Sequence, residues 1–108
     1  MEHDVSVCGA QPCAACRHKA TPRDDAQLRG LQNRLSRMIG QLQGISRMLE
    51  DNRYCGDVLT QVAAVQSALQ SFGHLVLREH METCVVEQIR QGDIGVIDET
   101  VDLIKQLK

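Results

Sequence analysis

The stretch LRGLQNRLSRMIGQLQGISRML, residues 28–49, places an apolar side chain at steps of three and four along its whole length. This heptad spacing is typical of a long amphipathic α-helix that buries one face. The stripe consists of Leu28, Leu31, Leu35, Met38, Leu42, Ile45 and Leu49. Since no strand-like alternation of apolar and polar residues occurs in the chain, the sequence predicts an all-α fold.

The residues before this stripe predict where the helix begins. Thr21 can cap it, the following proline suits the first helical position, and Asp24 and Asp25 complement the positive end of the helix dipole. Residues 1–20 show clustered cysteines and no periodicity. We therefore expect a flexible Cys-rich tail over residues 1–20 and a helical domain over residues 21–108.

Downstream, the segment EDNRY (residues 50–54) interrupts the periodicity and predicts a short connection. The segment RQGD (residues 90–93) ends the second helix, because Gly92 suits the left-handed position that follows a helix C-terminus. Between these breaks runs a second stripe of Cys55, Val58, Val62, Val65, Leu69, Phe72 and Val76. A short third helix is predicted from Ile94 to Leu107, and the residues expected to face inward are Ile97, Val101, Ile104 and Leu107.

Two long antiparallel helices and a short third one cannot cover both apolar stripes within a single chain of 108 residues. Pairing two such hairpins into an antiparallel four-helix bundle is the simplest way to bury them. We therefore expect a homodimer as the basic unit.

The composition predicts a cytoplasmic protein that does not span a membrane. No apolar run approaches the roughly 20 residues of a membrane span, and no export signal is visible. The five cysteines are then expected to be reduced thiols, for which metal binding or redox chemistry is more typical than a disulfide framework.

The net charge is −2, but the charged residues are distributed unevenly along the chain. Residues 17–54 hold eight basic and four acidic side chains, whereas residues 55–108 hold four basic and eight acidic ones. A segregated basic segment indicates a polyanionic partner for one face of the protein. An ordinary solvated helix surface is the alternative.

Cys55, His80 and Cys84 form a candidate metal site, although they lie far apart in the sequence. Around an uninterrupted α-helix, His80 falls about 20° to one side of Cys55 and Cys84 about 20° to the other. Along the axis, Cys55 and His80 are separated by roughly 37 Å at about 1.5 Å per residue, so one chain cannot close the site. An antiparallel pair of second helices can, because it places Cys55 of one subunit beside His80 and Cys84 of the other, twice over by symmetry.

Two thiolates and one imidazole make a soft set of three ligands, which favours Cu(I) or Zn(II). Structural zinc normally has four ligands, whereas Cu(I) accepts fewer, so the set favours Cu(I). The alternative is that both cysteines are buried core thiols and that His80 is a hydrogen-bonded surface residue.

The segment NRLSRMIGQLQGISRMLEDNRYCGDVLTQVAAVQSAL (residues 33–69), followed by LREHMETC (residues 77–84), resembles the copper-sensing transcriptional repressors of the CsoR/RcnR group. The resemblance covers about residues 24–107. It implies helical dimers that pair into a dimer-of-dimers tetramer, bind operator DNA when metal-free and release it on binding Cu(I), which derepresses copper-resistance genes.

The same resemblance implies roles for individual residues. Cu(I) would be bound by Cys55 of one protomer and by His80 and Cys84 of the other. Tyr54 and an acidic residue of the third helix, best matched by Glu99, would support the ligands from outside. The residues expected to contact DNA are Arg34, Arg37 and Gln41, and phosphate contacts of this kind depend strongly on salt.

Branches of this family differ in their inducers, and the Cys-His-Cys set is closest to the copper branch. A sensor of persulfide, nickel, cobalt or zinc is the alternative within the family. Three accessory cysteines depart from the family pattern, namely Cys8, Cys13 and Cys16. They could bind further soft metal with His3 or His18 assisting. An unstructured tail without a metal role is the alternative.

Two functions without DNA could use the same thiols. A cytosolic soft-metal buffer or chaperone would not need the arginines of the first helix. A thiol enzyme would use Cys55 or Cys84 with His80 as a base, but the sequence supplies no oxyanion hole or substrate cleft, so we do not expect an enzyme. DNA binding that weakens when metal is added distinguishes the repressor from both.

Overall fold

The computed structural model describes residues 18–107, and these residues contain helices and turns but no strand. The elements are α2 (Asp25–Glu50), α3 (Cys55–Glu79), a π-helical segment (His80–Val85), α4 (Val86–Arg90) and α5 (Val96–Leu107). The predicted all-α fold is therefore confirmed. None of the helices in this part of the chain has the length and apolar content needed to cross a membrane.

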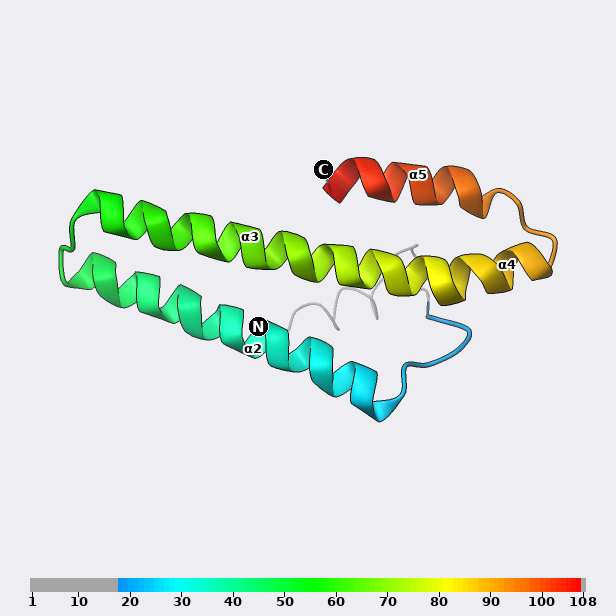
Figure 1. The fold of residues 1–108 in the computed structure, drawn as a ribbon, viewed down its shortest axis with the longest axis horizontal. Helices are drawn as coiled ribbons and strands as arrows, with labels where there is room; N and C mark the ends of the chain where they lie inside the picture. The colour runs from blue at the N-terminus through cyan, green and yellow to red at the C-terminus, as the bar shows by residue number, and fades with distance from the viewer. Residues whose placement is uncertain (1–17, 108) are drawn as a thin grey trace, which may run out of the picture.

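Helix α3 lies at the centre of the arrangement (Figure 1). It runs antiparallel to α2 and continues through the π-helical segment into α4 as one rod. Helix α5 folds back onto this rod on the side away from α2. The result is an elongated molecule, 56 Å long and less than 30 Å across, as its extents of 29 Å and 27 Å show.

Helix α2 begins after Asp24, so the prediction that Thr21 caps it is wrong. The Asp24 carboxylate accepts a hydrogen bond from the Gln27 N–H at 2.7 Å, and the Gln27 side chain accepts one from the Asp24 N–H at 3.4 Å. This reciprocal capping box satisfies two N–H groups, whereas a lone threonine satisfies one. The Thr21 hydroxyl instead hydrogen-bonds the carboxylate of Glu87.

The predicted breaks between helices are confirmed. Helix α2 ends at Glu50, and Asn52 in the following turn has a φ of 52°, a left-handed value that asparagine adopts more readily than most residues. Helix α4 ends at Arg90, and Gly92 has a φ of 91°. Glycine carries no Cβ that would oppose this conformation.

Only three of the seven residues of the α2 stripe are covered within the chain. Met38 is 6% exposed, and Leu31 and Ile45, seven residues to either side, are half-buried. The alternate members of the stripe are exposed, and they are Leu28, Leu35, Leu42 and Leu49. An open apolar seam of this length is what the predicted second copy would cover.

Helix α5 packs with a different face from the one predicted. Val96 is 1% exposed and Thr100 is also buried, with its hydroxyl donating to the Val96 carbonyl at 2.8 Å. Ile97 is 47% exposed, and the other two residues wrongly predicted to face inward, Val101 and Ile104, are exposed as well. The helix is apolar on two adjoining faces, and periodicity alone cannot tell which one meets α3. Leu107 does face inward, against Gly73.

Candidate metal centre

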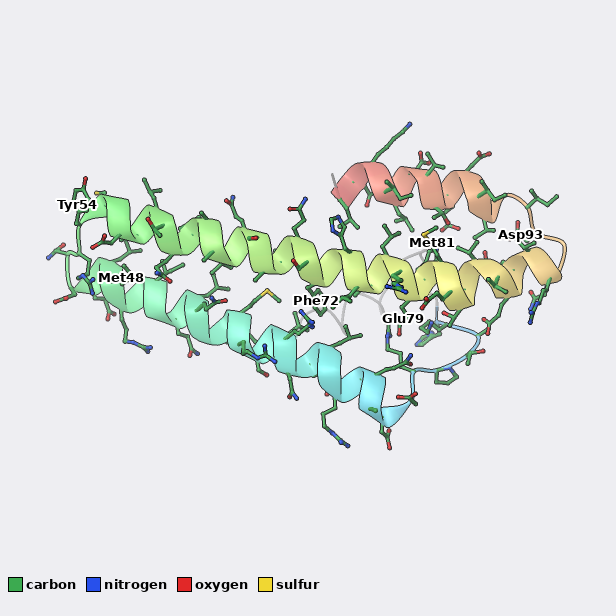
Figure 2. The ribbon with its side chains drawn as sticks, in the orientation of Figure 1. Met48, Tyr54, Phe72, Glu79, Met81 and Asp93 are labelled. Carbon is green, nitrogen blue, oxygen red and sulfur yellow. The ribbon has the colours of Figure 1, made fainter. Side chains whose placement is uncertain are left out.

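The three predicted ligands lie at opposite ends of one rod. Cys55 is the first residue of α3 and is exposed, whereas His80 and Cys84 belong to the π-helical segment at the far end. Figure 2 shows this separation, since the labelled neighbours Tyr54 and Met81 lie far apart along the rod. Within residues 18–107, no three His, Cys, Asp or Glu side chains of the single chain gather closely enough to hold a metal ion.

The π-helical segment changes the geometry expected for His80 and Cys84. The prediction assumed an uninterrupted α-helix, and this is wrong at residues His80–Val85. In a π-helix each turn contains more residues, so a residue four positions on falls short of a full turn, instead of lying about 40° beyond it. Both side chains nevertheless line one hollow on the surface of the rod.

His80 has a nitrogen suited to a metal ion. Its Nε2 atom is buried and has no hydrogen-bond partner among the described residues. A buried polar atom without a partner is uncommon and calls for an explanation. An imidazole nitrogen that binds a metal must keep its lone pair free, so this arrangement fits a ligand.

Cys84 is half-buried, and its sulfur is held by a residue that the sequence analysis did not identify. The Lys19 ammonium donates a hydrogen bond to Cys84 Sγ at 3.3 Å and another to Thr83 Oγ1 at 3.1 Å. The Thr83 hydroxyl in turn donates to the Glu79 carbonyl at 2.8 Å. No sequence signal links Lys19 to Cys84, because the two are 65 residues apart.

Residues 18–24, which we call the strap, form one wall of a hollow beside these ligands. The hollow has a volume of about 350 Å³. Its wall from the rod includes His80 and Cys84, and its wall from the strap includes His18 and Lys19. An imidazole and a thiol that line one hollow fit a soft metal ion such as Cu(I), with room for a further ligand.

Tyr54 and Glu99 lie at the two separated halves of the predicted site. Tyr54 is exposed at the cap position of α3, next to Cys55, and its ring lies over Gly56 so closely that a Cβ there would clash. Glu99 is half-buried in the first turn of α5, the helix that packs against the π-helical segment. In an antiparallel pair, Tyr54 of one chain would approach the end of the rod that carries Glu99 in the other.

Arg34, Arg37 and Gln41 line a single surface hollow of about 450 Å³ between α2 and α3. All three are exposed. Within residues 18–107, neither arginine forms an ion pair, so both guanidinium groups can meet an external anion. The proposed accessory ligands Cys8, Cys13 and Cys16 lie outside the described residues.

Known proteins resemble this chain over most of its length. Over 90 residues it is 38% identical to the copper-sensing transcriptional repressor CsoR of Bacillus subtilis (strain 168), covering 82% of this chain and 85% of that protein. The crystal structure of the copper-sensing repressor CsoR with Cu(I) from Geobacillus thermodenitrificans NG80-2 superposes with a TM-score of 0.78 at 38% identity, covering 83% of this chain and 95% of that one.

The nickel-responsive transcriptional regulator InrS is also similar, with a TM-score of 0.66 at 33% identity over 82% of this chain and 99% of that one. A family model described as a metal-sensitive transcriptional repressor matches residues 27–106, which include all three predicted ligands. This chain therefore belongs to the family of metal-sensitive transcriptional repressors.

Proposed function

We propose that this protein is a copper-sensing repressor of the cytoplasm, which binds operator DNA when metal-free and releases it when Cu(I) binds. Copper-resistance genes would be expressed on release. The observation that carries the proposal is that Cys84 and His80, whose buried Nε2 has no partner within residues 18–107, line one hollow, while Cys55 lies at the opposite end of the same rod. Because Cys55 of the same chain lies too far away, a second copy would have to supply this thiol.

Cys55 of the partner subunit, with His80 and Cys84 of this chain, would hold the ion. Bound Cu(I) would supply a cross-link between the two chains through soft ligand bonds. The partly covered α2 stripe supports this dimer, because its exposed leucines need an apolar partner. We further propose that two dimers form a tetramer, which would present four copies of the arginine surface to DNA.

Arg34, Arg37 and Gln41 are the proposed DNA contacts. Their place in one exposed hollow, with no competing carboxylate paired to either arginine in residues 18–107, supports binding to phosphate. Because these residues lie on α2 and the ligands lie on the rod, direct contact between metal and DNA does not connect the two sites. Metal and DNA must instead favour different arrangements of the helices, and the effect must be reciprocal.

The test of the function is operator affinity with and without metal. We expect the metal-free protein to shift a DNA fragment from upstream of its own gene, and one equivalent of Cu(I) per chain to weaken that binding about tenfold to a hundredfold. An operator affinity that does not change when Cu(I) is added would exclude a copper sensor. Absence of DNA binding alongside tight Cu(I) binding would indicate a metal buffer or chaperone instead.

Replacing Arg37 with alanine should weaken operator binding and flatten its dependence on salt. Each lost phosphate contact lowers the slope of log affinity against log salt by about 0.9. Cu(I) affinity of the DNA-free protein should not change. Arg53→Ala is a matched control, because Arg53 is an exposed arginine already paired with Asp57 near the turn at the far end of α2. Equal effects of the two substitutions would remove Arg37 from the interface.

A nickel sensor is the second candidate, and one specific observation favours it. His18 lines the hollow that holds His80 and Cys84, so a second imidazole is available. Imidazole ligands suit Ni(II), and the similar regulator InrS is nickel-responsive. Release of DNA by Ni(II) but not by Cu(I), with loss of the Ni(II) response in His18→Ala, would favour this candidate.

The remaining alternatives are ranked lower. Membership of a family of transcriptional regulators supports a regulator instead of a thiol enzyme. Persulfide or zinc as the inducer would be recognised by release of DNA without copper. We also propose that Cys8, Cys13 and Cys16 of the tail bind additional soft metal, and a Cu(I) stoichiometry above one per chain that falls when all three are replaced would support this.

A further inference from the structure

Three alternate residues of the strap hold it against the rod beside the ligands. Lys19 donates to Thr83 and Cys84, Thr21 hydrogen-bonds Glu87, and the Arg23 guanidinium pairs with the Glu79 carboxylate at 2.8 Å. All the partners lie on the rod within one or two turns of His80. The strap therefore crosses the region where the partner subunit's Cys55 would have to approach.

Lys19 and a metal ion need the same atom. The ammonium group lies 3.3 Å from Cys84 Sγ and uses a lone pair of that sulfur as its acceptor. A metal bond to Cys84 also uses a sulfur lone pair. An ion that enters from the hollow, which Lys19 lines together with His80 and Cys84, would approach the side of the sulfur where the ammonium group lies, so the two compete for that position.

Resting on the proposed function, we propose that Lys19 is a gate on the metal site. In the metal-free chain it holds Cys84 and keeps the strap closed. When Cys84 binds the metal, Lys19 leaves the sulfur, and the strap is released from the end of the rod. Lys19 acts here as a positioning residue and is not itself a ligand.

The strap also connects this event to the DNA-binding helix. Its last residues, Arg23 and Asp24, are the rod contact and the N-terminal cap of α2. While the strap is closed, the start of α2 is tied to the end of α3 by the Arg23–Glu79 pair, whose carboxylate is largely buried. Release of the strap removes the contact beside that pair and loosens the end of the helix that carries Arg34 and Arg37.

The reactivity of the lysine amines tests this gate directly. In a brief pulse of a lysine-acetylating reagent, Lys105 is an internal reference, because it is exposed on α5. In the metal-free protein we expect Lys19 to react about tenfold more slowly than Lys105, the factor that a hydrogen bond to a polar or charged partner supplies. After anaerobic loading with one equivalent of Cu(I), Lys19 should react as fast as Lys105.

A matched pair of threonine variants separates the gate from general loosening. Thr83→Val removes one of the two acceptors of Lys19 and should raise its reactivity several-fold in the metal-free protein. Thr60→Val is the control, because both threonine hydroxyls donate to the carbonyl four residues earlier in the same rod, but Thr60 is exposed near the end of the rod that is far from Lys19. It should leave Lys19 unchanged.

Cu(I) bound to each sample is measured in parallel with a competing chelator. Tight Cu(I) binding with Lys19 still protected, or Lys19 as reactive as Lys105 before loading, overturns the gate and leaves the proposed function intact. Failure of Cu(I) to bind overturns the proposed function, and the gate with it.

Discussion

A 1:1 mixture of Cys55→Ala and Cys84→Ala chains is expected to bind Cu(I) tightly at about a quarter of the parent's capacity, although neither variant does so alone. Half of the randomly formed dimers contain one chain of each kind, and two-fold symmetry gives each of these one intact site and one site without thiols. Each variant alone should lose about a hundredfold in affinity, since one ligand of a protein metal site supplies about 3 kcal/mol.

The measurement is Cu(I) binding in competition with a chelator, after the two variants are unfolded and refolded together. Both should be made in a background in which Cys8, Cys13 and Cys16 are alanine, so that the tail cysteines do not bind the metal. Mixing each variant with itself is the control. If a Cys55→Ala dimer keeps the parent's affinity, the site does not span two chains.

The second large effect is expected from residues that need not bind the metal at all. Glu99→Ala and Tyr54→Phe should keep Cu(I) affinity within about tenfold of the parent, because both thiolates and the imidazole remain. They should nevertheless lose most of the copper-driven release of DNA, so that Cu(I) changes operator affinity by less than about threefold. The physical reason is that a ligand histidine is oriented through its second nitrogen, and the partner there carries the signal.

Operator affinity with and without Cu(I) checks this expectation, alongside Cu(I) affinity with and without DNA, which must change by the same factor. Asp98→Ala is the matched control for Glu99→Ala, because Asp98 is the preceding acidic residue of α5 and is exposed. If Glu99→Ala and Tyr54→Phe both release DNA as fully as the parent, the coupling runs through the metal ligands alone.

The helices could be predicted from the sequence wherever local signals decide. The heptad stripe of α2, the break at residues 51–54 and the left-handed Gly92 depend on neighbouring residues only. The buried face of α5 could not be predicted, because Ile97 and Val96 belong to equally apolar faces and only contact with α3 selects Val96. The π-helical segment also leaves no periodic signature, since it adds a single wide turn to a long helix.

Part of the candidate site could also be predicted from the sequence, and part of it could not. The separation of Cys55 from the other two ligands follows from helical spacing and is confirmed, whereas the shared side of all three stays a prediction. Lys19 could not be found, because its contact with Cys84 joins a non-helical segment to a helix across 65 residues. Such a pairing depends on the whole path of the chain and on no local pattern.

The short turn between α2 and α3 has a consequence for the order in which the molecule assembles. Residues 51–54 form a short loop, and closing it costs less entropy than bringing together residues far apart in the sequence, so we expect helix pairing to begin beside the turn and spread outward. The strap contacts join residues 56 to 66 positions apart, at the open end of the hairpin. We expect them to form last and to open first. Because opening them would leave the pairing beside the turn in place, the strap could respond to a metal ion without unfolding of the protein.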